Sequence, residues 1–165
     1  MKSEEINYEL NKVQEIIDNI EVGMLTTMQD DGDHKSRPMQ TQKLDADGNL
    51  WFFTSRTSHK TEELQKHPNV NVAYADIDAQ SYVSVVGEAS IVDDAAVKKE
   101  LWNQTVKAWF PDGLDDPDLT VLKVNIKSAE YWDSSSSSMV QAYHIAKALI
   151  TGEQNDEGEH GEVKM

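Results

Sequence analysis

The 165-residue chain contains no cysteine and only two arginines. The absence of cysteine excludes disulfides, thiolate catalysis and cysteine-bound zinc or iron–sulfur centres. Basic residues are also few, because 15 Lys and Arg face 30 Asp and Glu, which gives a formal charge of −15 at pH 7. A charge of this sign disfavours both the phosphate backbone of nucleic acids and the anionic surface of a membrane. We therefore expect no nucleic acid and no membrane among the partners.

Long apolar runs are missing as well. No stretch of 18 apolar residues occurs, and the first residues, MKSEEINYELNK, lack the basic start and apolar stretch of a signal peptide. The simplest expectation is a cytoplasmic protein. The length, together with a hydrophobic share of 38%, suits one domain with a core of ordinary proportions.

The first 92 residues predict one helix followed by strands. An amphipathic helix that covers the core is indicated by apolar residues spaced four and three positions apart, namely Ile6, Leu10, Val13, Ile17 and Ile20. After it, short segments rich in Thr, Val, Phe and Tyr are separated by the turn sequences DDGD and DADGN. These segments predict strands near 22–29, 35–44, 49–54, 69–77 and 81–92. A short helix capped by Ser58 is expected between the third and the fourth strand.

The remaining residues predict two more helices and one or two strands. We expect a helix from Asp93 to about Ala108, a strand over 119–126 and a further extended piece at 129–132. A run of serines then leads into a last helix with apolar residues on one face. Residues 1–151 form the expected single domain. The segment 152–165 is acidic and too polar to pack, and it predicts a mobile tail.

Two residues inside predicted strands indicate curvature. Pro38 cannot donate a ladder hydrogen bond, so its strand should be an edge, a bulge or a ligand-facing rim there. Gly87 indicates a bulge or bend. Because most successive strands are close enough to pair as hairpins, the pattern favours an α+β fold. In that fold a small, mainly β, antiparallel barrel carries flanking helices, in contrast to a parallel βαβ sheet.

The sign of the charge is inverted in one region. Residues 34–61 contain five basic and two acidic residues, whereas the rest of the chain has ten basic and 28 acidic residues. Both arginines, Arg37 and Arg56, lie in this cationic segment. One interpretation is a site for an anion, because a phosphate needs local donors and charge in an acidic protein. The alternative is that these basic groups pair with acidic neighbours.

The residue types of the segment TSRTSHK (54–60) suit a phosphate. It offers backbone N–H groups at a helix start, the hydroxyls of Thr54, Ser55, Thr57 and Ser58, and the side chains of Arg56, His59 and Lys60. The three aromatic residues just before it supply flat apolar surface, although at least one of them must belong to the core because strand side chains alternate.

The sequence resembles the pyridoxamine 5′-phosphate oxidase-like family of split-barrel flavoproteins, and within it the general stress protein branch. The matching pieces occur in order along nearly the whole chain: SRPMQ, LWFFTSRTSHK, HPNVNVAYAD, YVSVVGEASIV, WFPDGLDDPDLTVLKV, AEYWD and the terminal TGE and GEHG. The resemblance implies an antiparallel split β-barrel homodimer with FMN in a cleft between the subunits. FAD or a deazaflavin is left open.

Carried over by position, the resemblance assigns eleven cofactor-binding residues. They are Arg37, Pro38, Met39 and Gln40 in the first flavin segment, Phe53, Thr54 and Ser55 in the next strand, Ser58, His59 and Lys60 at the phosphate, and Tyr82. Two of these depart from the family pattern. His59 replaces an arginine, which weakens the phosphate clamp above about pH 6.5, where imidazole is mostly neutral. Tyr82 replaces a glutamine.

A further departure concerns the substrate. Oxidases of this family that act on pyridoxamine phosphate carry a C-terminal Arg-x-His element, and this chain has no arginine after Arg56. Oxidation of that vitamin is therefore disfavoured. In the same region, Trp109 and Phe110 could flank the cofactor from the partner subunit or seal the dimer, and we favour the seal.

No other catalytic or metal-binding pattern emerges. DADGN begins like a calcium loop, but Arg56 falls where the closing glutamate is needed. The five histidines show no paired ligand spacing, and no residue stands out as an acid or base. The sequence thus predicts an FMN-binding general stress protein that acts as an oxidoreductase. A flavin-sequestering protein without turnover and a cofactor-free interaction module remain as alternatives, so enzymatic activity itself is left open.

Overall fold

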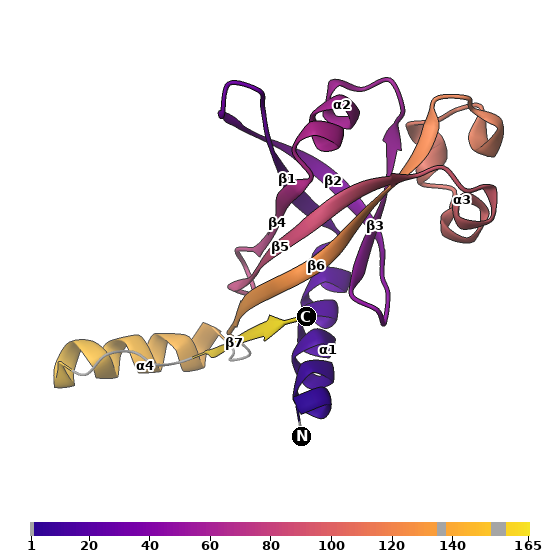
Figure 1. The fold of residues 1–165 in the computed structure, drawn as a ribbon. Coiled ribbons are helices and arrows are strands. Elements are labelled where there is room, and N and C mark those ends of the chain that lie inside the picture. Colours follow the sequence, from indigo (N-terminus) through magenta and orange to yellow (C-terminus); the bar gives the residue numbers. More distant parts are fainter. Residues whose placement is uncertain (1, 135–137, 153–157) are drawn as a thin grey trace.

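The computed structural model describes residues 2–134, 138–152 and 158–165. Six antiparallel strands form a closed barrel in the order β3-β2-β1-β4-β5-β6, which is closed by pairing of β3 with β6, and β7 extends the sheet beyond β6. Figure 1 shows this barrel with α1 at one end and α2 at the other. The strands are β1 (Val22–Met28), β2 (His34–Leu44), β3 (Asn49–Ser55), β4 (Asn69–Asp76), β5 (Ser81–Val92), β6 (Leu119–Asp133) and β7 (Glu159–Lys164). The helices are α1 (Lys2–Ile20), α2 (His59–Lys66), α3 (Ala95–Leu101) and α4 (Ser138–Thr151), with 3₁₀ turns η1 (Val106–Ala108) and η2 (Gly113–Asp115).

Helix α1 covers one end of the barrel, as its apolar stripe predicts. Leu10, Val13 and Ile17 are buried and belong to the same core cluster as Phe52 and Val85 of the strands. Burying a side chain of this size contributes about 1.5–3 kcal/mol to the free energy of unfolding. The helix is therefore part of the core.

Pro38 and Gly87 lie where the ladder is irregular, as predicted. Pro38 pairs with Met24 of β1, whereas the register with β3 begins only at Thr41, so at Pro38 β2 has a neighbour on one side alone. Gly87 sits at a register shift between β5 and β6. A Cβ there would lie 2.6 Å from the carbonyl oxygen of Asn125, so the close approach of the two strands requires glycine.

The predicted helix over 93–108 is wrong in length. Asp94 caps α3 by accepting from the N–H groups of Ala96 and Val97, but the helix ends at Leu101 and Trp102 is extended. After it, the Asn103 side chain accepts from the N–H of Thr105. Such a local bond satisfies the backbone outside a helix, and this is why asparagine ends helices readily.

The C-terminal segment corrects the expectation of a mobile tail over 152–165. Residues Glu159–Lys164 form β7, which pairs with β6 from Ser128 to Asp133, and Val163 is buried. Glu159 forms an ion pair with Lys12 of α1 at 3.0 Å. Residues 153–157 of the predicted tail lie outside the described part. The strand was not predicted, because a single buried valine in a polar sequence gives almost no periodic signal.

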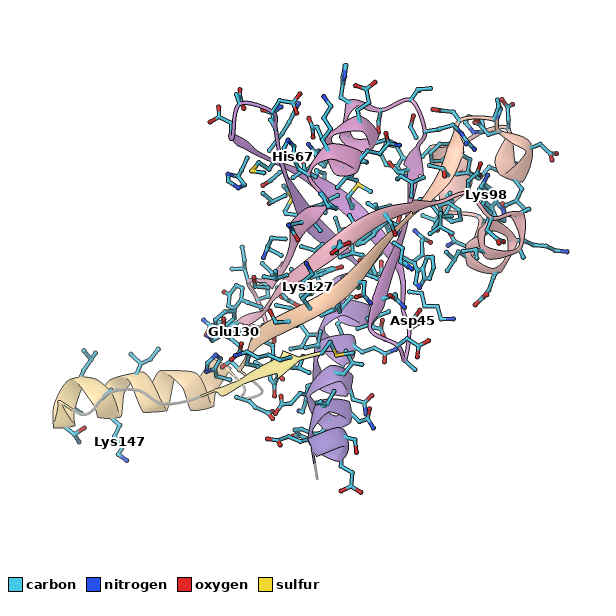
Figure 2. The ribbon with its side chains drawn as sticks, in the orientation of Figure 1. Asp45, His67, Lys98, Lys127, Glu130 and Lys147 are labelled. Atoms are coloured by element: carbon cyan, nitrogen blue, oxygen red, sulfur yellow. The ribbon has the colours of Figure 1, made fainter. Side chains whose placement is uncertain are left out.

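Helix α4 extends away from the barrel between the ends of β6 and β7 (Figure 1). Figure 2 shows Lys147 on this helix far from the barrel, and Glu130 near the point where the helix departs. Ile145, Leu149 and Ile150 are exposed. In the described part of the chain, none of the helices is both long and apolar enough to cross a membrane.

Candidate functional site

One pocket lies between the barrel and the segment that follows α3. Its volume is about 500 Å³, which is within the range of small-molecule sites. Strands β2 and β3 form one wall, Lys60 at the start of α2 contributes a cation, and residues 106–118 form the opposite wall. The residues that line it are Val22, Pro38, Met39, Gln40, Gln42, Phe53, Thr54, Ser55, Lys60, Val106, Trp109, Phe110, Asp116 and Asp118.

Seven of the eleven residues assigned by resemblance line this pocket together. They are Pro38, Met39, Gln40, Phe53, Thr54, Ser55 and Lys60. The remaining four, Arg37, Ser58, His59 and Tyr82, do not line it. The irregular stretch of β2 at Pro38 exposes backbone and side chains to the pocket, because no β3 residue pairs with it there.

Lys60 is a cation without a nearby carboxylate partner. Its ammonium lies 3.3 Å from the sulfur of Met39, and among the described residues no carboxylate comes within ion-pair distance of it. Burial and, to a smaller extent, the positive charge of Arg37 together lower the pKa of Lys60 to about 8, while Glu63 opposes the shift. A lysine in such surroundings is stabilised by an anionic ligand.

Thr54 supplies an unused hydroxyl to the same pocket. The residue is only 3% exposed, and its Oγ1 has no hydrogen-bond partner within the part of the chain that the structure describes. A buried hydroxyl without a partner costs about 1–3 kcal/mol. The cost is recovered when a ligand bonds to it, so Thr54 marks the pocket as a place for a polar group.

The other cations of the segment 34–61 are largely paired with acidic neighbours. Arg37 donates to Glu63 at 3.2 Å and to the Thr27 hydroxyl at 2.7 Å. Arg56 forms an ion pair with Asp93 at 2.8 Å. Lys43 forms one with Glu100 at 2.9 Å. The alternative that these basic groups pair with nearby carboxylates therefore holds for three of them, and Lys60 is the one directed to the pocket.

Ser58 and His59 occupy other positions than the resemblance implies. Ser58 holds the N-cap position of α2, as predicted, but its hydroxyl donates to the carbonyl of Ser55 instead of capping the helix. His59 lines a separate polar hollow of about 460 Å³ between the β1–β2 hairpin and α2, together with Glu62 and Lys35. Neither side chain lines the pocket that contains Lys60.

The segment 106–118 contributes site residues that sequence reasoning missed. Asp118 accepts hydrogen bonds from the Ser55 hydroxyl, the Thr57 N–H at 2.9 Å and the Thr57 hydroxyl at 3.0 Å. These bonds hold the pKa of Asp118 below its usual range. The surrounding acidic stretch resembles an ordinary solvated loop, so this contact could not be predicted from its residue types. Trp109 and Phe110 line the pocket of their own chain, a placement that the sequence did not predict.

Tyr82 lies on the outer face of the sheet. It pairs with Trp132 of β6, and Trp132 pairs with His160 of β7, whose ring stacks on the indole at 5.4 Å. Further exposed apolar residues on this face are Val22, Met24 and Val86. Val22 is paired with Gln40, so the outer face continues into the pocket.

The pocket combines a cation, an unpaired hydroxyl and aromatic walls, and it suits a planar ligand that carries an anionic group. Within the described ranges, no group of three His, Asp or Glu side chains is arranged to hold a metal ion.

Comparisons with known proteins agree with this architecture. The model of the family described as "Pyridoxamine 5'-phosphate oxidase like" matches residues 8–156. The chain belongs to the pyridoxamine 5′-phosphate oxidase-like family. It is 36% identical over 118 residues to general stress protein 26 of Bacillus subtilis (strain 168), which covers 68% of this chain and 80% of that protein.

Solved structures of this family superpose closely. A general stress protein 26 from Jannaschia sp. CCS1 matches with a TM-score of 0.77 at 26% identity, over 96% of this chain and 99% of that one. The general stress FMN/FAD binding protein from Xanthomonas citri matches with a TM-score of 0.67 at 28% identity, over 81% of this chain and 92% of that one. The fold class expected from the sequence is therefore confirmed, and the chain is similar to general stress protein 26.

Proposed function

We propose that this protein binds FMN in the pocket between β2, β3 and residues 106–118 and acts as a flavin-dependent oxidoreductase. The observation that carries the proposal is that two polar groups able to bind a ligand line the same pocket. Among the described residues, the Lys60 ammonium has no carboxylate within ion-pair distance and the buried Thr54 hydroxyl has no hydrogen-bond partner. A phosphoryl group and a polar flavin edge would supply both. The description of the Xanthomonas citri relative as FMN/FAD binding supports the choice of a flavin.

The residues present fit such a cofactor. Lys60 and Ser55 would hold the phosphate, while the backbone at Pro38–Gln40 would hold the polar edge of the ring. Phe53, Trp109 and Phe110 give the apolar surface on which a planar ring packs. When bound, flavin supplies the electron and hydride chemistry, and the protein supplies binding and orientation.

We further propose that the active form is a homodimer. Val22, Met24, Val86, Tyr82 and Trp132 leave an apolar outer sheet face that continues into the pocket. Exposed apolar patches of this kind mark protein interfaces. A second copy covering this face would bring its Tyr82 and Trp132 toward the pocket of the first copy, which would account for the absence of Tyr82 from the pocket lining of a single chain.

A visible spectrum of the purified protein tests the proposal. We expect flavin absorbance in the purified protein or on adding FMN, and a large loss of affinity in Lys60→Met. Lys35→Met is the matched control, because Lys35 is exposed on β2 and does not line the pocket. A preparation that stays colourless with added FMN would remove the flavin assignment. Catalytic bleaching and reoxidation with a reduced nicotinamide would support an oxidoreductase, and FMN binding without it would favour a flavin store.

A further inference from the structure

Asp118 occupies a ready-made anion site beside the pocket. Its carboxylate accepts from three donors, namely the hydroxyl of Ser55 at the end of β3 and both the N–H and the hydroxyl of Thr57 in the loop that follows. Converging hydroxyl and backbone N–H donors of this kind bind carboxylates and phosphates alike, since both are charged oxygen acceptors. The chain fills this site with an acceptor of its own.

Two independent observations show that the site adjoins a ligand pocket. Ser55, Lys60 and Asp118 line the same pocket, so one of the donor residues, the cation and the carboxylate border one space. The neighbouring Thr54 is 3% exposed, lines this pocket and leaves its hydroxyl without a partner in the described part of the chain. The pocket therefore contains unmet hydrogen-bonding capacity next to donors that Asp118 has taken.

We propose that Asp118 is an internal competitor for the phosphoryl group of the ligand, which must displace its carboxylate to reach Ser55 and Thr57. The inference rests on the proposed function, because it concerns how FMN enters that site. The exchange needs only a side-chain rotation. The backbone carbonyl of Asp118 accepts from the N–H of Arg56 at 2.7 Å, and this bond can hold the chain in place while the carboxylate turns away.

Because the Asp118 carboxylate must be displaced, a phosphate binds more weakly than it would bind to the same donors without Asp118. The carboxylate is ionised at neutral pH, because its hydrogen bonds hold the pKa of Asp118 below the usual range. A displaced carboxylate remains close to an incoming dianion, and two like charges at close range repel. Asp118 thus sets the affinity for ligands with a phosphoryl group and leaves the affinity for the ring unchanged.

The test compares FMN with riboflavin, which has the same ring but no phosphate. Asp118→Asn keeps the shape of the side chain and removes its charge, and we expect it to bind FMN about tenfold more tightly with little change for riboflavin. Asp115→Asn is the matched control, because Asp115 is exposed in η2 and does not line the pocket. Flavin fluorescence titration gives both dissociation constants.

A second measurement follows the donors directly. The Thr57 amide resonance should shift when FMN is added to the wild-type protein, and it should not shift with riboflavin. FMN binding to Asp118→Asn that is equal to or weaker than the wild type, at an unchanged melting temperature, overturns the inference while leaving the proposed function intact. If Asp118→Asn melts lower, an unmoved Thr57 amide in the wild-type complex overturns it instead. Absence of FMN binding in all three proteins would overturn the proposed function itself.

Discussion

Thr54 and Thr120 are partners across β3 and β6, and each has a buried hydroxyl without a hydrogen bond in the described residues. Only Thr54 lines the pocket. The two residues therefore allow two explanations of a buried hydroxyl without a partner to be compared. In the first, the protein tolerates the small free-energy cost of an unsatisfied hydroxyl. In the second, a bound ligand forms a hydrogen bond to it.

Replacing Thr54 with valine should therefore stabilise the free protein and weaken the complex. Thr54→Val removes an unsatisfied group at nearly constant volume, so we expect the free energy of unfolding to rise by about 1 kcal/mol and the melting temperature by about 3 °C. FMN affinity should fall about fivefold, because the hydroxyl no longer bonds to the ligand. Thr120→Val should give the same gain in stability with unchanged affinity, and equal affinities in the two variants would contradict a role for Thr54.

Lys60 should make FMN binding depend on pH. Its pKa is lowered to about 8 by burial and by Arg37, so the ammonium loses its proton as the pH rises through 8. The phosphate is already a dianion above pH 7, which leaves Lys60 as the group that changes. We expect the affinity for FMN to fall between pH 7.5 and about 9. In Lys60→Arg the guanidinium stays charged, so titrations across the same range should show no inflection near 8.

The lowered pKa of Lys60 also affects the free energy of unfolding, in the direction opposite to its effect on FMN affinity. The folded chain binds this proton less tightly than the unfolded chain, so the unfolded state holds more protons between about pH 8 and the ordinary lysine pKa near 10.4. The Lys60 contribution to the free energy of unfolding is unfavourable below pH 8 and is relieved as the pH rises through this window. Flavin affinity and this part of the stability therefore change in opposite directions with pH.

The individual elements were predictable wherever a local signal defines them. Turn sequences such as DADGN place β2 and β3 correctly. Asp45, which is labelled in Figure 2, lies in that turn. It stabilises the turn by accepting from the N–H of Asn49 and the indole N–H of Trp51. Apolar spacing likewise locates α1. Strand β7 has no comparable signal, because its partner β6 lies more than twenty residues earlier and Val163 alone among its residues is buried. Long-range pairing decides its structure.

The packing of β7 gives a prediction at the scale of this element. Val163→Ala should lower the free energy of unfolding by about 1–2 kcal/mol, because it leaves a cavity against the core cluster that contains Tyr131 and Ala129. Lys164→Ala on the exposed side of the strand should change it by less than about 0.5 kcal/mol. Chemical denaturation measures both. A mobile C-terminal segment would predict no difference between the two variants.

Across the whole molecule, charge counts alone could not locate the site. The five cations of residues 34–61 suggested a positive region, yet carboxylates distant in sequence, such as Asp93 and Glu100, pair with Arg56 and Lys43. Of the five cations, Lys60 is the one that lines the pocket. The residue types that suit a phosphate were readable, whereas the contact of Asp118 with Ser55 joins positions 63 residues apart and depends on the closed barrel.

The apolar outer face of the barrel gives the last prediction, which concerns assembly. Val86 is 46% exposed on β5, in the face that also carries Met24 and Trp132. Val86→Lys places a charge in the interface proposed for the homodimer, and a buried unpaired charge there costs several kcal/mol. We expect light scattering to report a monomer, and FMN affinity to fall because Tyr82 and Trp132 of the partner subunit would no longer lie next to the pocket. Leu149→Lys on the projecting helix α4 is the control with the same change in charge, and a dimer that survives Val86→Lys would place the interface elsewhere.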